Sequence, residues 1–204
     1  MKKELLFGLA ATFFMFSCGE GGEETTEGND STAVETVEEE VVVMNYEIDT
    51  AASVINWMNF NGEEKDHYGT VKVLSGSYTV ENDVITEATL SADMNTITSD
   101  DEMGGEKLEG HLMAPDFFDV NQFASATFNF DRHEEGMVYG TLNTAGMDFP
   151  VEAPVTVSEG SIEVGEFKVD MSSLAFFQME KEKEADESKW HDPMIGFTAT
   201  IVGK

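Results

Sequence analysis

The side chains of this chain that could do chemistry are one thiol, four imidazoles and many carboxylates. The imidazoles are His67, His111, His133 and His191, and none lies two or four residues from another, as in short metal-binding motifs. Ser172-Ser173 lacks the glycine-flanked turn that exposes a nucleophilic serine. Forty-one acidic residues make some close carboxylate pair inevitable, so their number does not indicate a glycosidase. We expect no catalytic residue, no metal site and no cofactor.

The thiol belongs to Cys18, at the end of an apolar N-terminal segment. Lys2 and Lys3 precede this segment, and the small residues Ser17 and Gly19 flank the cysteine. A basic start, a short apolar run and small residues are typical of a secretory signal peptide. The run is shorter than the roughly 20 apolar residues that a membrane-spanning helix needs. An ordinary signal peptide with a coincidental cysteine is one interpretation.

The same segment resembles the lipobox of bacterial lipoproteins, in which the cysteine becomes the first mature residue and carries acyl chains. That resemblance implies a signal peptide over residues 1–17, lipid attachment at Cys18 and a membrane anchor made of several acyl chains. We therefore expect the protein in the bacterial cell envelope, anchored to the outer membrane on its periplasmic or surface face.

Residues 18–44 are expected to form an acidic, flexible tether. Residues 19–40 hold nine acidic residues, no basic residue and almost no large apolar side chain, so they cannot bury enough surface to fold. The net charge of the whole chain is −30, which argues against nucleic acid and anionic lipid headgroups as partners. A single cysteine allows no intramolecular disulfide.

Residues 45–204 are predicted to form one β domain, whose strands must position any functional site. Short segments alternate apolar and polar residues and are separated by Gly, Asn and Asp, which predicts strands at 53–60, 68–80, 84–94, 126–132, 137–145, 149–157, 161–171 and 195–201. A short helix is expected from about Glu102 to Met113. The acidic segment from Gln178 to Trp190 is expected to be a surface excursion or a solvated helix. Eight strands in meander order must close into a barrel or split into a sandwich.

The motifs along this domain resemble those of the YceI-like family. They are Tyr46-Glu47-Ile48-Asp49 with Ser53-Val54-Ile55-Asn56-Trp57, His67-Tyr68-Gly69-Thr70-Val71, Asp116-Phe117-Phe118-Asp119, Ala126-Thr127-Phe128-Asn129-Phe130, the hairpin from Tyr139 to Met147, and Phe167-Lys168-Val169-Asp170. The chain departs from the family pattern at Asn143, Met147-Asp148 and Met171, and the 178–190 excursion has no counterpart in it.

The resemblance implies an all-β fold, an antiparallel eight-stranded lipocalin-like barrel with one or two short helices, whose apolar interior holds a long lipid tail. An eight-stranded barrel can hold one small ligand, and each buried methylene contributes about 0.8 kcal/mol. We expect a ligand of polyisoprenoid or fatty-acyl type, bound without catalysis. Family members can dimerise, so a homodimer is an alternative to a monomer.

The expected ligand-binding residues follow from shared strand faces and from the family motifs. Phe117 and Phe118 lie beside the expected helix and would close or line the barrel end, His67 would lie at the rim near a headgroup, and the cavity wall would comprise Trp57, Phe128, Phe130, Leu142 and Phe197. The alternatives are a structural or interaction protein whose barrel is filled by its 15 Phe and 12 Met, and an enzyme that acts on a bound lipid.

Overall fold

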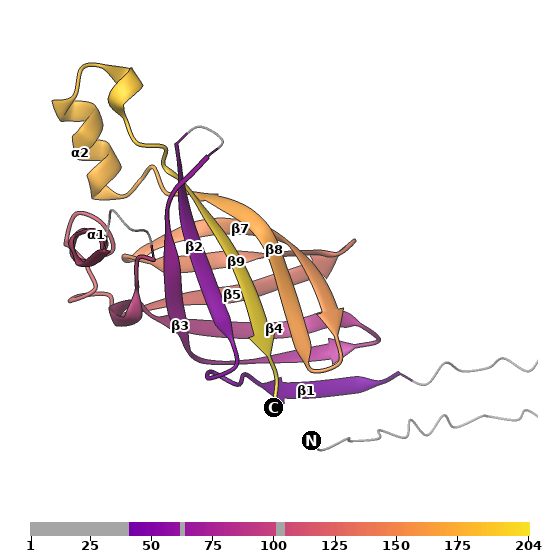
Figure 1. Ribbon diagram of the computed structural model, residues 1–204. Coiled ribbons are helices and arrows are strands. Elements are labelled where there is room, and N and C mark those ends of the chain that lie inside the picture. The colour runs from indigo at the N-terminus through magenta and orange to yellow at the C-terminus, as the bar shows by residue number, and fades with distance from the viewer. Residues whose placement is uncertain (1–40, 62–63, 101–104) are drawn as a thin grey trace, which may run out of the picture.

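The computed structural model describes residues 41–61, 64–100 and 105–204 (Figure 1). The expected signal peptide, Cys18 and most of the expected tether lie outside these residues. The first described strand begins at Val43, two residues before the domain boundary that the sequence indicated.

Nine strands and two α-helices make up the described fold. The strands are β1 (Val43–Glu47), β2 (Val54–Asn61), β3 (Glu64–Glu81), β4 (Val84–Asp93), β5 (Ser125–Glu134), β6 (Met137–Thr144), β7 (Met147–Ser158), β8 (Ser161–Asp170) and β9 (Met194–Val202). The helices are α1 (Gly105–Leu112) and α2 (Ala175–Lys183), with short 3₁₀ turns at Met94–Thr96 and Glu187–Lys189.

Eight of the strands close into an antiparallel barrel, which confirms the fold that the sequence predicted. The order runs β3-β2-β9-β8-β7-β6-β5-β4, and β4 pairs back onto β3. The tight turn between β6 and β7 is formed by Ala145 and Gly146, whose φ angles of 51° and 71° suit a two-residue hairpin. Closure leaves no long unpaired edge around the described barrel.

One strand was not expected. β1 pairs with the last residues of β3, from Ser77 to Glu81, whereas β2 pairs with the first part of β3. Beyond β1, Ile48 forms an isolated bridge with Gly203 at the C-terminal end of the chain. The additional strand therefore extends the barrel wall along the part of β3 that does not pair with β2.

Both helices lie at the same end of the barrel, which we call the helix end (Figure 1). The expected helix at 102–113 is present as α1. The second helix, α2, overlaps the expected excursion at 178–190 but begins three residues before it, at Ala175. No helix of the described residues is long and apolar enough to cross a membrane.

The buried side chains form two clusters, one toward each end of the barrel. The larger contains Trp57, Leu112, Phe117, Phe118 and Phe177 at the helix end. The smaller contains Tyr46, Ile48, Tyr78, Val80 and Ile201, and we call this end the base. Ile55, Phe128 and Val164 contact both clusters.

Candidate functional site

The barrel encloses a cavity of about 270 Å³. Its lining comes from all eight barrel strands and from both helices, and extends from Phe176 and His191 at the helix end to Tyr78 and Ile162 at the base. His67 and Tyr78, both in β3, are 11 residues apart. At about 3.3 Å per residue and a tilt of about 35–45°, they span roughly 25–30 Å of barrel length. The cavity is therefore long and narrow.

All eight residues expected to contact a ligand line this cavity. They are Trp57, His67, Phe117, Phe118, Phe128, Phe130, Leu142 and Phe197. The strand residues share the inner face because side chains alternate along a strand: in β5, Ala126, Phe128 and Phe130 line the cavity, whereas Asn129 is exposed. Whether these side chains contact a lipid stays a prediction.

Trp57 is held in place by a hydrogen bond and by a glycine. Its indole Nε1–H donates to the carbonyl oxygen of Thr98 at 2.9 Å. Gly69 lies opposite Trp57 in the β2–β3 pair, and a Cβ atom at Gly69 would lie 1.8 Å from the same oxygen. The absence of a side chain at residue 69 thus allows the indole to lie over β3 and reach the carbonyl of Thr98.

The base of the cavity is closed by stacked rings. The rings of Tyr46 and Tyr78 stack with centroids 4.9 Å apart, and Ile48 packs over Gly76. Burial and the neighbouring Tyr46 raise the pKa of Tyr78 from 10.0 to about 12. The Tyr78 hydroxyl is buried beside the backbone of Gly203 and stays neutral at physiological pH.

A cluster of aromatic rings lies at the helix end. Phe117 contacts Phe118, Phe176 and Phe177 with ring centroids 4.8, 5.5 and 5.7 Å apart. The backbone N–H of Phe176 donates to the carbonyl of Asp116 at 2.6 Å and so ties the first turn of α2 to the segment after α1. Phe176 and Phe177 were not among the predicted cavity residues, although an adjacent aromatic pair just before the acidic excursion is a signal that a helix docks there.

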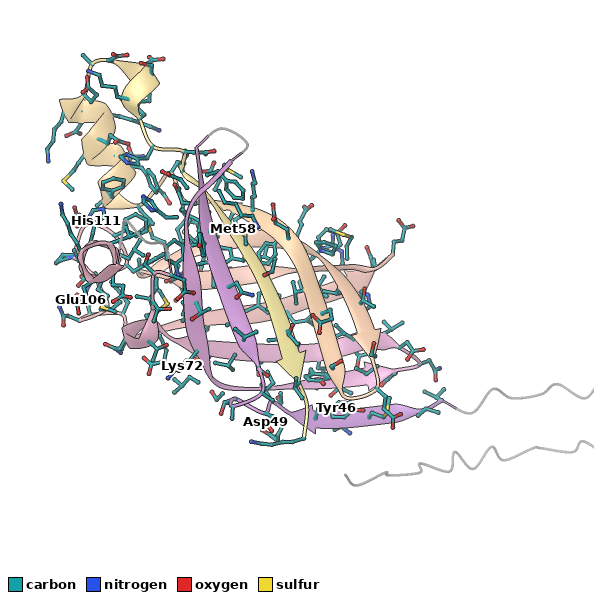
Figure 2. All side chains as sticks on the ribbon, viewed as in Figure 1. Tyr46, Asp49, Met58, Lys72, Glu106 and His111 are labelled. Atoms are coloured by element: carbon teal, nitrogen blue, oxygen red, sulfur yellow. The ribbon has the colours of Figure 1, made fainter. Side chains whose placement is uncertain are left out.

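Three of the four histidines also line the cavity at this end. Phe176 lies between His111 and His191, with centroids 4.9 and 5.4 Å away, and His67 pairs with Asn59 across β2 and β3. Figure 2 shows His111 on α1 at the helix end, far from Tyr46 on β1. His191 Nδ1 lies 2.6 Å from Glu180 Oε1. The three histidines are far apart in the sequence, so their proximity could not be predicted from it and arises only in the folded barrel.

The remaining histidine, His133, lies outside the cavity and contributes to the fold. His133 does not line the cavity, and its Nδ1 accepts a hydrogen bond of 3.0 Å from the backbone N–H of Ile85. Burial lowers the pKa of His133, which favours the neutral ring that this bond requires. Among the described residues, no three His, Cys, Asp or Glu side chains are placed to hold a metal ion.

Asp170 lies where β8 leads into α2. Its carboxylate accepts a 2.9 Å hydrogen bond from the backbone N–H of Ser172, and this bond lowers the pKa of Asp170. The ionised carboxylate thereby fixes the turn from which α2 begins.

Comparison with known proteins agrees with this architecture. The YceI-like domain profile matches residues 46–201, and no curated protein matches the chain. Among solved structures, BcnA of Burkholderia cenocepacia is 14% identical with a TM-score of 0.51, over 77% of this chain and 99% of that one. The YceI protein of Campylobacter jejuni is 17% identical with a TM-score of 0.41, over 59% and 73% of the two chains. The profile match covers most of the sequence, and the chain therefore belongs to the YceI-like domain family.

Proposed function

We propose that this protein binds and carries a long-chain apolar lipid in the barrel cavity. The observation that carries the proposal is an internal cavity of about 270 Å³ whose lining is mostly aliphatic and aromatic. Typical ligand pockets measure about 300–1,000 Å³, so this one suits a slim chain rather than a broad ring system. The cavity also argues against the alternative of a barrel filled solid by its own side chains.

The binding energy would come from burial of the tail. Each methylene transferred from water contributes about 0.8 kcal/mol, which is about a fourfold change in affinity. Association itself costs about 4–15 kcal/mol, so only a long tail gives stable binding. Such binding needs no reacting group, in keeping with a carrier rather than an enzyme.

We propose a location for the carrier from its N-terminal sequence. Acyl chains on Cys18 would anchor the protein to the bacterial envelope, at the outer membrane, and the acidic residues 19–40 would hold the barrel away from the lipid surface by self-repulsion. This anchor rests on the sequence alone, and mass spectrometry of the N-terminal peptide tests it directly.

The test of the carrier is a chain-length series. The full chain with Cys18→Ser, which has no thiol to carry acyl chains, is titrated by calorimetry with primary alcohols from octanol to octadecanol. Affinity should rise about fourfold per methylene until the tail fills the cavity, and then level off. An affinity independent of chain length would contradict encapsulation.

A matched pair of variants locates the binding. Ala199 lines the cavity and pairs with both Ile55 and Val164 at the middle of the barrel, so Ala199→Phe should obstruct the tail. Val54 is 37% exposed and neighbours Ile55 on β2, so Val54→Phe adds the same ring outside the barrel. Circular dichroism establishes that both variants fold. Equal binding by the two variants would place the ligand elsewhere.

A further inference from the structure

No Lys, Arg, Asp or Glu is among the described residues that line the cavity, although these four types make up 25% of the chain. An ionised group inside such a cavity would lose its hydration without gaining a partner of opposite charge. The lining therefore disfavours any ligand that carries a charge inside the barrel.

Polar side chains that could serve a ligand head gather at the helix end. His67, His111 and His191 line the cavity there, and Asn59, which also lines it, donates from Nδ2 to the Asp192 carbonyl at 3.2 Å. Each imidazole can donate or accept a hydrogen bond. At the base, by contrast, stacked tyrosines and aliphatic side chains close the cavity.

Carboxylates already face two of these imidazoles. Glu180 Oε1 lies 2.6 Å from His191 Nδ1, and Asp66 Oδ2 lies 3.7 Å from His67 Nε2. An anionic head at this position would meet these carboxylates at close range, on a protein whose net charge is −30. Hydrogen-bonding groups without charge fit the same position at no such cost.

We propose that the ligand is an uncharged lipid, an alcohol, ester or ketone on one long hydrocarbon tail, whose head lies among Asn59, His67, His111 and His191 while its tail extends toward Tyr78. This inference rests on the proposed carrier function and narrows its ligand class. It excludes fatty acids and prenyl diphosphates, which have suitable tails but anionic heads.

The experiment compares ligands that share a tail and differ only in the head. The full chain with Cys18→Ser is titrated with geranylgeraniol and geranylgeranyl diphosphate, and separately with hexadecanol and hexadecanoate. In each pair the alcohol should bind at least about tenfold more tightly than the anion, since only the anion must leave its charge unpaired. An anion that binds as tightly as its alcohol, or more tightly, overturns the inference.

A charge placed in the lining should reverse this selectivity. His111→Lys adds a cation at the helix end and should raise the affinity for geranylgeranyl diphosphate at least about tenfold. Asn129→Lys makes the same change of net charge at an exposed position of β5, outside the cavity, and should leave the affinity nearly unchanged. The same increase in both variants would show that total charge, not the lining, sets the selectivity.

The position of the head is read from the imidazole NMR signals of the unsubstituted histidines. Geranylgeraniol should shift the signals of His67, His111 and His191, while His133, outside the cavity, serves as the internal control. A shift of His133 alone would place the head elsewhere. If neither member of either pair binds, the proposed carrier function itself fails, whereas equal binding refutes only the uncharged head.

Discussion

Gly69 and Trp57 show how a single residue shapes the cavity wall. The indole reaches Thr98 only because residue 69 has no side chain to occupy that space. The alternation of apolar and polar residues predicted that Trp57 faces inward. The hydrogen bond to Thr98 could not be predicted, since it joins residues 41 positions apart.

Alanine substitutions at two glycines distinguish the steric clash expected at Gly69 from the general effect of replacing a glycine. Gly69→Ala should lower the free energy of unfolding by about 1–3 kcal/mol or more, because its Cβ would lie 1.8 Å from the Thr98 oxygen. Gly110 is exposed in α1, and a Cβ atom there would meet no described atom within 4 Å, so Gly110→Ala should raise stability by about 0.5–1 kcal/mol. Urea denaturation measures both. Equal effects would mean that the contact at Gly69 is relieved by backbone movement.

The single residue Tyr78 should make the free energy of unfolding depend on pH. Its pKa is raised from 10.0 to about 12, so the unfolded chain loses this proton first, and stability should fall as pH rises from about 10 to about 12. Below pH 10, Tyr78 should not make the free energy of unfolding change with pH. Tyr78→Phe should flatten the alkaline decline relative to the unsubstituted protein, as measured by urea denaturation across this range. Parallel curves for the two proteins would contradict a buried, neutral hydroxyl.

At the scale of elements, alternation was enough to predict the barrel strands but not their irregularities. β3 runs through a register shift between Val73 and Ser75, which leaves Leu74 exposed and reverses the faces that follow. Met58 and Phe60 are buried although they lie outside the cavity lining, because both pack over the bare backbone of Gly196. β1 is short and pairs only with a distant part of β3, so local pattern gave no sign of it.

α2 is the element whose role was least predictable. Its exposed positions are polar or charged apart from Ala175, and of its residues Phe176 and Phe177 line the cavity. The three histidines at the helix end come from β3, from α1 and from the segment that follows α2, so their convergence depends on tertiary structure.

The aromatic contact of α2 predicts how fast a lipid exchanges. Phe176→Ala removes the ring that lies between His111 and His191 and should accelerate release of a bound fluorescent lipid to acceptor vesicles several-fold. Glu182→Ala, at an exposed position of the same helix, is the control. Unchanged release from Phe176→Ala would show that the lipid leaves by another route.

For the whole molecule, the net charge of −30 governs approach to membranes. Transfer of lipid to anionic vesicles should be slower than to zwitterionic vesicles at low salt. The difference should shrink as the screening length falls from about 10 Å at 0.1 M salt to about 3 Å at 1 M. Stopped-flow fluorescence measures both rates. A difference that persists at high salt would rule out surface charge as its origin.

Lipid retention by the barrel can be measured by native mass spectrometry of the full chain with Cys18→Ser, purified without added lipid or detergent. We expect a species heavier by one lipid, which organic extraction should remove. The Val54→Phe variant should retain this lipid, and the Ala199→Phe variant should lose it. A chain found only at its own mass, and unable to take up any long-chain lipid afterward, would contradict the claim that the cavity is a lipid-binding site.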